Sequence, residues 1–86
     1  MPRVLTMTRT IIVPAERKRY LARLQSKKDY YARQNCRFWA FEETSLPGAF
    51  LEFYEGPDRE TLASAHESAP DPVVDPSRMY QEVELR

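Results

Sequence analysis

The chain has 86 residues, a length typical of one domain, which we assign to residues 1–86. Basic and acidic residues balance at 13 each, and no apolar run is long enough to cross a membrane, so the sequence predicts no membrane partner. The single cysteine, Cys36, excludes an intramolecular disulfide, and the first ten residues lack the apolar core of a signal peptide. We therefore expect a cytoplasmic protein.

Charge is unevenly distributed along this neutral chain. Residues 1–37 contain ten Lys and Arg residues against two acidic ones, whereas residues 38–86 contain three basic and eleven acidic residues. A solvated basic helix face and solvated acidic strand ends would produce this division, and we favour that interpretation because charge runs usually face water. The alternative is an anion-binding or self-complementary surface.

A strand followed by a long helix is predicted for the first third of the chain. Residues 3–13 are rich in β-branched side chains and lack glycine and proline, which favours a strand. Pro14 suits the first turn of a helix, because that position needs no backbone N–H, and we expect this helix to run to about residue 34. Asn35 is expected to end it. The apolar stripe of this helix is predicted to consist of Tyr20, Leu21, Leu24 and Tyr31.

A hairpin, a short helix and a last strand are predicted for the rest. Residues 36–43 and 49–56 alternate in polarity and flank a Pro-Gly turn, which indicates a β-hairpin. Asp58 is expected to cap a helix that runs to about residue 68. Three prolines between residues 70 and 76 exclude regular structure there, and residues 78–86 are predicted to form a strand.

This order of elements predicts an α+β, ferredoxin-like βαββαβ fold, with a four-stranded antiparallel sheet and both helices on one face. The other face is left open. We expect the purely apolar side chains of the last two strands, such as Leu51 and Phe53, to point toward the helices. For the second strand, the alternation does not decide whether Phe38 or Trp39 faces outward. The open face is then expected to carry Phe50, Glu52, Tyr54, Tyr80, Glu82 and the row Thr6, Thr8 and Thr10.

An aromatic open face is typical of a ligand site or of a protein interface. Two such faces closing on each other would form a homodimer, a dimeric α+β barrel with a central cavity. We favour the dimer over a monomer with an amphipathic face, because small domains gain most from added burial.

In the order of its elements, the chain resembles the antibiotic-biosynthesis-monooxygenase-like (ABM) domains of the dimeric α+β barrel superfamily. Members often show a third strand that ends in Glu-x-aromatic, then a turn and a short helix with a histidine, a pattern matched here by Glu52, Tyr54 and His66. Some members oxygenate aromatic or quinol substrates without a cofactor, and some degrade haem. The resemblance implies a hydrophobic, aromatic small-molecule ligand, no cofactor, and catalytic roles for His66 and Glu52. The expected open face adds the substrate contacts, which we predict to be Tyr54, Phe50, Tyr80, Trp39 and Thr8.

His66 is the only histidine of the chain. It lies on the apolar stripe of the second helix, so we expect it half-buried at the rim, with the helix C-terminus favouring its protonated form. No ligand cluster accompanies it, so the sequence predicts no metal site. A structural rim residue, a general base and a haem ligand are the alternatives for His66. Glu52 and Glu82 are either an acid/base pair or partners of Arg37 or Arg9 in cross-strand ion pairs.

Two other functions fit the same fold. One is a non-catalytic barrel that binds a ligand or serves as a subunit. The other is an RNA-recognition module, since residues 49–53 resemble the end of that family's third-strand motif. However, Thr6 and Thr8 stand where a stacking aromatic is needed, and Glu52 and Glu82 repel phosphate. We therefore expect no nucleic-acid partner.

Overall fold

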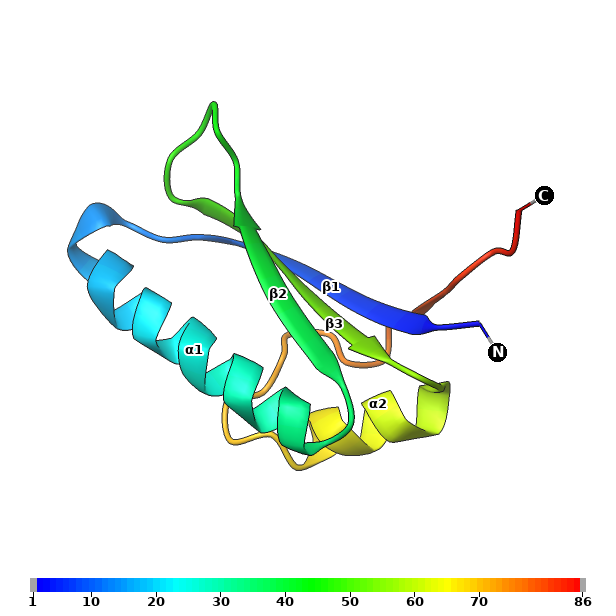
Figure 1. Ribbon diagram of the computed structural model, residues 1–86. Coiled ribbons are helices and arrows are strands. Elements are labelled where there is room, and N and C mark those ends of the chain that lie inside the picture. The colour runs from blue at the N-terminus through cyan, green and yellow to red at the C-terminus, as the bar shows by residue number, and fades with distance from the viewer. Residues whose placement is uncertain (1, 86) are drawn as a thin grey trace.

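The computed structural model describes residues 2–85 and confirms the ferredoxin-like fold. The sheet is antiparallel with strand order β2-β3-β1-β4. Both helices lie against the same face of this sheet (Figure 1). No helix within residues 2–85 is long and apolar enough to span a membrane. The elements are β1 (Val4–Ile11), a 3₁₀ turn (Pro14–Glu16), α1 (Arg17–Arg33), β2 (Arg37–Glu42), β3 (Ala49–Gly56), α2 (Arg59–Glu67) and β4 (Tyr80–Gln81).

Local signals set the ends of these elements. Asp58 caps α2, because its carboxylate accepts a hydrogen bond from the Thr61 backbone N–H at 2.7 Å. Asn35 follows α1 with φ 60°, the left-handed conformation that Asn tolerates better than most residues. In the hairpin loop Gly48 has φ 96°, where a Cβ would lie 2.6 Å from the carbonyl oxygen of Ile12. The predicted ends of both helices and of the hairpin therefore agree with the structure to within a few residues.

The register of the sheet assigns every side chain to a face. Thr6 lies opposite Tyr54, which lies opposite Phe38, and these three are buried beneath the helices. Their neighbours Met7, Phe53 and Trp39 form the next row across the sheet and point to the open face, because side chains alternate along a strand. The expected orientation of β3 was therefore wrong, and so was that of Thr6, Thr8 and Thr10, which lie opposite the helix-facing residues of β3. The open side chains of β3 are Leu51, Phe53 and Glu55, and the helix-facing ones are Phe50, Glu52 and Tyr54.

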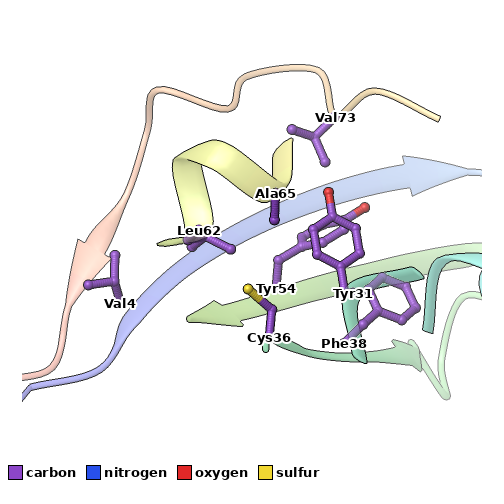
Figure 2. Packing of buried hydrophobic residues seen from close by; sticks show 8 residues of the cluster. All are labelled: Val4, Tyr31, Cys36, Phe38, Tyr54, Leu62, Ala65 and Val73. Atoms are coloured by element: carbon purple, nitrogen blue, oxygen red, sulfur yellow. The ribbon is translucent and has the colours of Figure 1, made fainter. Parts of the chain in front are cut away.

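The core lies between the sheet and the helices and is unusually rich in tyrosine. Tyr31 and Tyr54 meet edge to face with ring centroids 4.9 Å apart, and Leu62 and Ala65 of α2 cover them (Figure 2). Val73, from the proline-rich segment after α2, closes the top of this cluster. Figure 2 shows the hydroxyl ends of both tyrosines pointing toward that segment. The loop after α2 is thus part of the core, although it has no regular structure.

The last strand is much shorter than predicted. β4 comprises two residues, which pair with Val4 and Leu5, and the backbone N–H of Glu82 donates to the carbonyl of Arg3 at 2.8 Å. Beyond it Val83 and Leu85 are exposed rather than turned toward the helices. Arg86, the end of the predicted strand, lies outside the described residues. β1 therefore has a partner along only its N-terminal part on this side.

Candidate functional site

A buried ion pair joins α1 to the centre of the sheet. The Lys27 ammonium donates to Glu52 Oε1 at 2.8 Å and to the Tyr54 hydroxyl at 3.0 Å. The Tyr54 hydroxyl donates in turn to Glu52 Oε1, and the Tyr20 hydroxyl donates to Oε2 at 2.5 Å. Lys27 and Glu52 are 8% and 4% exposed. Within residues 2–85, every buried side-chain nitrogen or oxygen has a hydrogen-bond partner, so this cluster is complete.

The cluster holds Glu52 as an anion. Burial by itself raises the pKa of the Glu52 carboxyl, but the hydrogen bonds from Lys27, Tyr20 and Tyr54 outweigh it and leave the pKa below its ordinary value. Burial, followed by the bond to this carboxylate, raises the pKa of the Tyr20 and Tyr54 phenols. Because three donors already occupy both carboxylate oxygens, Glu52 has no free oxygen that faces a ligand. The arrangement therefore favours a positioning role over that of a base.

His66 is the centre of a second buried chain of polar groups. Its Nδ1 lies 2.7 Å from the Tyr31 hydroxyl and its Nε2 lies 2.9 Å from Thr6 Oγ1. The expected half-buried, protonated rim residue was wrong: His66 is 5% exposed, and burial lowers the pKa of its imidazole to about 4. The effect of burial on the pKa of His66 is thus larger than the opposite effect of the helix C-terminus. At neutral pH the ring is uncharged, so one nitrogen donates and the other accepts.

A pocket of about 410 Å³ opens between α1 and the segment after α2. We call it the helix-side pocket. Its walls are mainly apolar, and Lys27 and Tyr31 form its inner end. These two side chains connect the pocket to both buried hydrogen-bond networks, because Lys27 bonds to Glu52 and Tyr31 bonds to His66. The lining residues are Ala22, Arg23, Ser26, Lys27, Tyr30, Tyr31, Ala69, Pro70 and Asp71.

The open face of the sheet carries a second hollow of about 680 Å³, which we call the open-face hollow. Leu5, Trp39, Phe41 and Tyr80 supply its apolar surface. The Trp39 and Phe53 rings stack with centroids 5.7 Å apart, and Phe41 meets the same Phe53 ring edge to face. One end of the hollow is charged, because Glu55 lies 2.9 Å from Arg3 and 3.7 Å from Arg37.

The predicted site residues therefore fall into two groups. Glu52 and Tyr54 lie together on the helix side, and the Tyr54 ring lies 5.2 Å from the His66 ring. Phe50 and Thr8 share this face, where Phe50 packs on Tyr20 at 4.7 Å. Trp39 and Tyr80 lie across the sheet on the open face. The predicted ion pairs were also wrong in their partners, since Glu52 pairs with Lys27, Glu82 with Arg3, and Arg9 with Glu43.

Sequence reasoning missed Lys27, the residue that joins the pocket to the sheet. Tyr20, Leu24, Lys27 and Tyr31 follow one another at spacings of four, three and four residues, which places Lys27 on the buried stripe of α1. The basic residues of this helix were expected on a solvated face, and Leu21, which is exposed, was placed on the apolar stripe. Arg23 and Asp71, at the mouth of the pocket, had no sequence signal, since they meet only in the folded chain.

No protein-family model matches the chain, and neither a curated protein nor a solved structure matches it. Within residues 2–85, no group of three His, Cys, Asp or Glu side chains is arranged to hold a metal ion.

Proposed function

We propose that this chain binds a small, hydrophobic aromatic molecule in the helix-side pocket and does not transform it by acid/base chemistry. The observation that carries this proposal is the pocket itself: its volume of about 410 Å³ falls within the range of small-molecule sites, and apolar walls surround a few polar groups. Both acid/base candidates are poorly suited to catalysis. Both oxygens of Glu52 already accept hydrogen bonds, and a histidine with a pKa of about 4 is a weak base at neutral pH.

Filling the pocket tests this function. Ser26→Trp puts an indole into the pocket wall, whereas Gln25→Trp puts the same indole on the neighbouring position of α1, outside the pocket. In calorimetric titrations with 2-naphthol as the probe, the wild type and Gln25→Trp are expected to bind with similar affinity and Ser26→Trp to lose binding. Equal binding by all three proteins would place the ligand elsewhere, and no binding to the wild type at millimolar probe would refute the proposal.

An ABM-like oxygenation is the second candidate, and the contact between Tyr31 and His66 favours it. The Tyr31 side chain reaches the pocket while its hydroxyl lies 2.7 Å from His66 Nδ1, so a proton could pass from a bound phenol through Tyr31 to the imidazole. Oxygen uptake with 1,4-dihydroxynaphthalene distinguishes the two. Uptake above the protein-free rate that His66→Gln abolishes would favour oxygenation, whereas a rate equal to the protein-free control would count against it.

We further propose that the open face is the interface of a homodimer, which would complete a dimeric α+β barrel. Phe41 and Tyr80 are 60% and 46% exposed on this face, beside the partly exposed Trp39 and Phe53. Exposed aromatic patches of this kind mark interfaces, and an 86-residue chain gains stability from covering them. A free cysteine and a hydrophobic ligand fit the cytoplasm, where we place the protein.

Sedimentation equilibrium at about 100 µM, well above the Kd of a standard-sized interface, tests the dimer. Phe41→Lys is expected to give a monomer, because it places a charge within the exposed aromatic cluster of the open face. Leu46→Lys is the matched control: Leu46 is 46% exposed in the hairpin loop, away from the open-face hollow, and this variant should stay dimeric. Trp39 emission should shift to the red in Phe41→Lys only. A monomeric wild type would refute the barrel.

A further inference from the structure

We infer that the helix-side pocket takes an aromatic carboxylate, whose carboxylate group displaces that of Asp71 from Arg23 and Lys27. This inference depends on the proposed function, because it names the class of the ligand that the same pocket would bind. It is carried by the position of Asp71, a carboxylate of the chain itself at the mouth of an otherwise mainly apolar pocket.

Asp71 occupies the place where an anionic ligand group would bind. Its two oxygens accept from the Arg23 guanidinium at 3.1 and 3.2 Å, and Oδ2 lies 3.7 Å from the Lys27 ammonium. One carboxylate therefore faces both cations of the pocket. Arginine presents its donors as a planar fork that fits any carboxylate, so a ligand acid can make the same contacts.

The position of Asp71 also allows a ligand to displace its carboxylate from Arg23. It lies in the segment after α2 that has no helix or strand, and its side chain is 33% exposed. The Arg23 side chain is 52% exposed, so the ion pair is close to water and is worth little to the fold. Breaking it leaves the carboxylate of Asp71 free to be solvated. Neither Arg23 nor Asp71 belongs to the core cluster that contains Val73 and Tyr31, so the pair can open without removing a core side chain.

In the displaced state Arg23 has lost its carboxylate partner, and only an anionic ligand replaces that contact in kind. Lys27 is already neutralised by Glu52 in the interior, so moving Asp71 away leaves Arg23 as the unpaired cation. A ligand carboxylate restores neutrality, while a neutral ligand does not. The rest of the pocket fits an aromatic ring, since Ala22, Tyr30, Ala69 and Pro70 supply flat apolar walls.

Two probes of the same shape test the inference. 2-Naphthoate carries the carboxylate, and 2-naphthamide is its neutral counterpart. Calorimetric titrations of the wild-type protein are expected to show tighter binding of 2-naphthoate. Asp71→Asn should tighten 2-naphthoate by about threefold to fivefold, because the competing anion is removed, and change 2-naphthamide by less than about twofold. Arg23→Gln should weaken 2-naphthoate by about threefold to fivefold and leave 2-naphthamide unchanged.

Asp75→Asn is the matched control. Asp75 lies in the same segment, and among residues 2–85 it pairs with nearby exposed groups, Arg78 and Ser77, so this variant makes the same change in net charge outside the pocket. If Asp75→Asn tightens 2-naphthoate as much as Asp71→Asn does, the effect is one of net charge and the inference is wrong. If both probes bind equally and Asp71→Asn changes neither, the inference fails while the pocket stands. If neither probe binds at millimolar concentration, the proposed function fails as well.

Discussion

Acid is expected to destabilise this protein well above the pH at which its carboxylates titrate, because His66 is buried and neutral. The unfolded chain binds a proton at His66 with a pKa near 6.5, whereas in the folded protein burial lowers that pKa to about 4. Between these values the unfolded state holds more protons than the folded state. The contribution of the neutral His66 to the free energy of unfolding is therefore fully present above about pH 7 and is lost as the pH falls from 6.5 toward 4.

The size of the effect follows from the two pKa values. Each pH unit between them is worth about 1.4 kcal/mol, so the free energy of unfolding should fall by about 2 kcal/mol between pH 7.5 and pH 5. The loss approaches about 3 kcal/mol below pH 4. The groups around the imidazole do not interfere, because burial raises the pKa of Tyr31 and of Tyr54 and keeps both phenols neutral.

Urea unfolding at pH 7.5, 6 and 5, at one fixed protein concentration, measures this loss. His66→Gln is the control: its amide can bond to Tyr31 and Thr6, and it cannot titrate, so its stability should change little over this range. If this variant does not fold, the NMR titration of the single histidine of the wild type gives its pKa directly. A measured pKa above 6, or a wild type as stable at pH 5 as at pH 7.5, would refute the burial argument.

The buried pair, the tight approach of α2 to β3 and the end of α1 give three further predictions. Lys27→Met should cost about 3–5 kcal/mol by leaving Glu52 charged and unpaired. The double variant Lys27→Met/Glu52→Gln should recover at least half of that loss in urea unfolding, and failure to recover would mean that the pair is not coupled. Gly56→Ala should cost about 1–3 kcal/mol in the same assay, because a Cβ there would lie 2.8 Å from Leu62 Cβ. Asn35→Gly should leave thermal stability equal or higher while Asn35→Val lowers it, since φ is 60° at this position; a stable Asn35→Val protein would contradict the left-handed C-terminus of α1.

Local sequence patterns were sufficient for the order of the elements and most of their ends. Asp58 caps α2 through a hydrogen bond to a residue three positions away, and Asn35 ends α1 through its own backbone angle. The hairpin of β2 and β3 follows from alternation and from one Pro-Gly turn. Because these signals act over a few residues, they indicate the fold without knowledge of its packing. The predicted last strand was too long. Residues 82–85 alternate like a strand, but within the described chain they have no paired neighbour beyond Glu82.

The face on which each strand residue lies was decided only by the tertiary structure. Both alternating sets of β3 contain aromatic side chains, but Leu51 and Phe53 alternate with a set that includes Glu52, so hydrophobicity alone favoured turning Leu51 and Phe53 inward. The polar set is buried instead because α1 brings Lys27 and Tyr20 to Glu52, and those partners are 25 and 32 residues away in sequence. A buried carboxylate is tolerated only where such donors are present. The candidate site has the same origin: α1 and the segment after α2 have no shared pattern in the sequence, and packing alone brings Arg23 and Lys27 to Asp71.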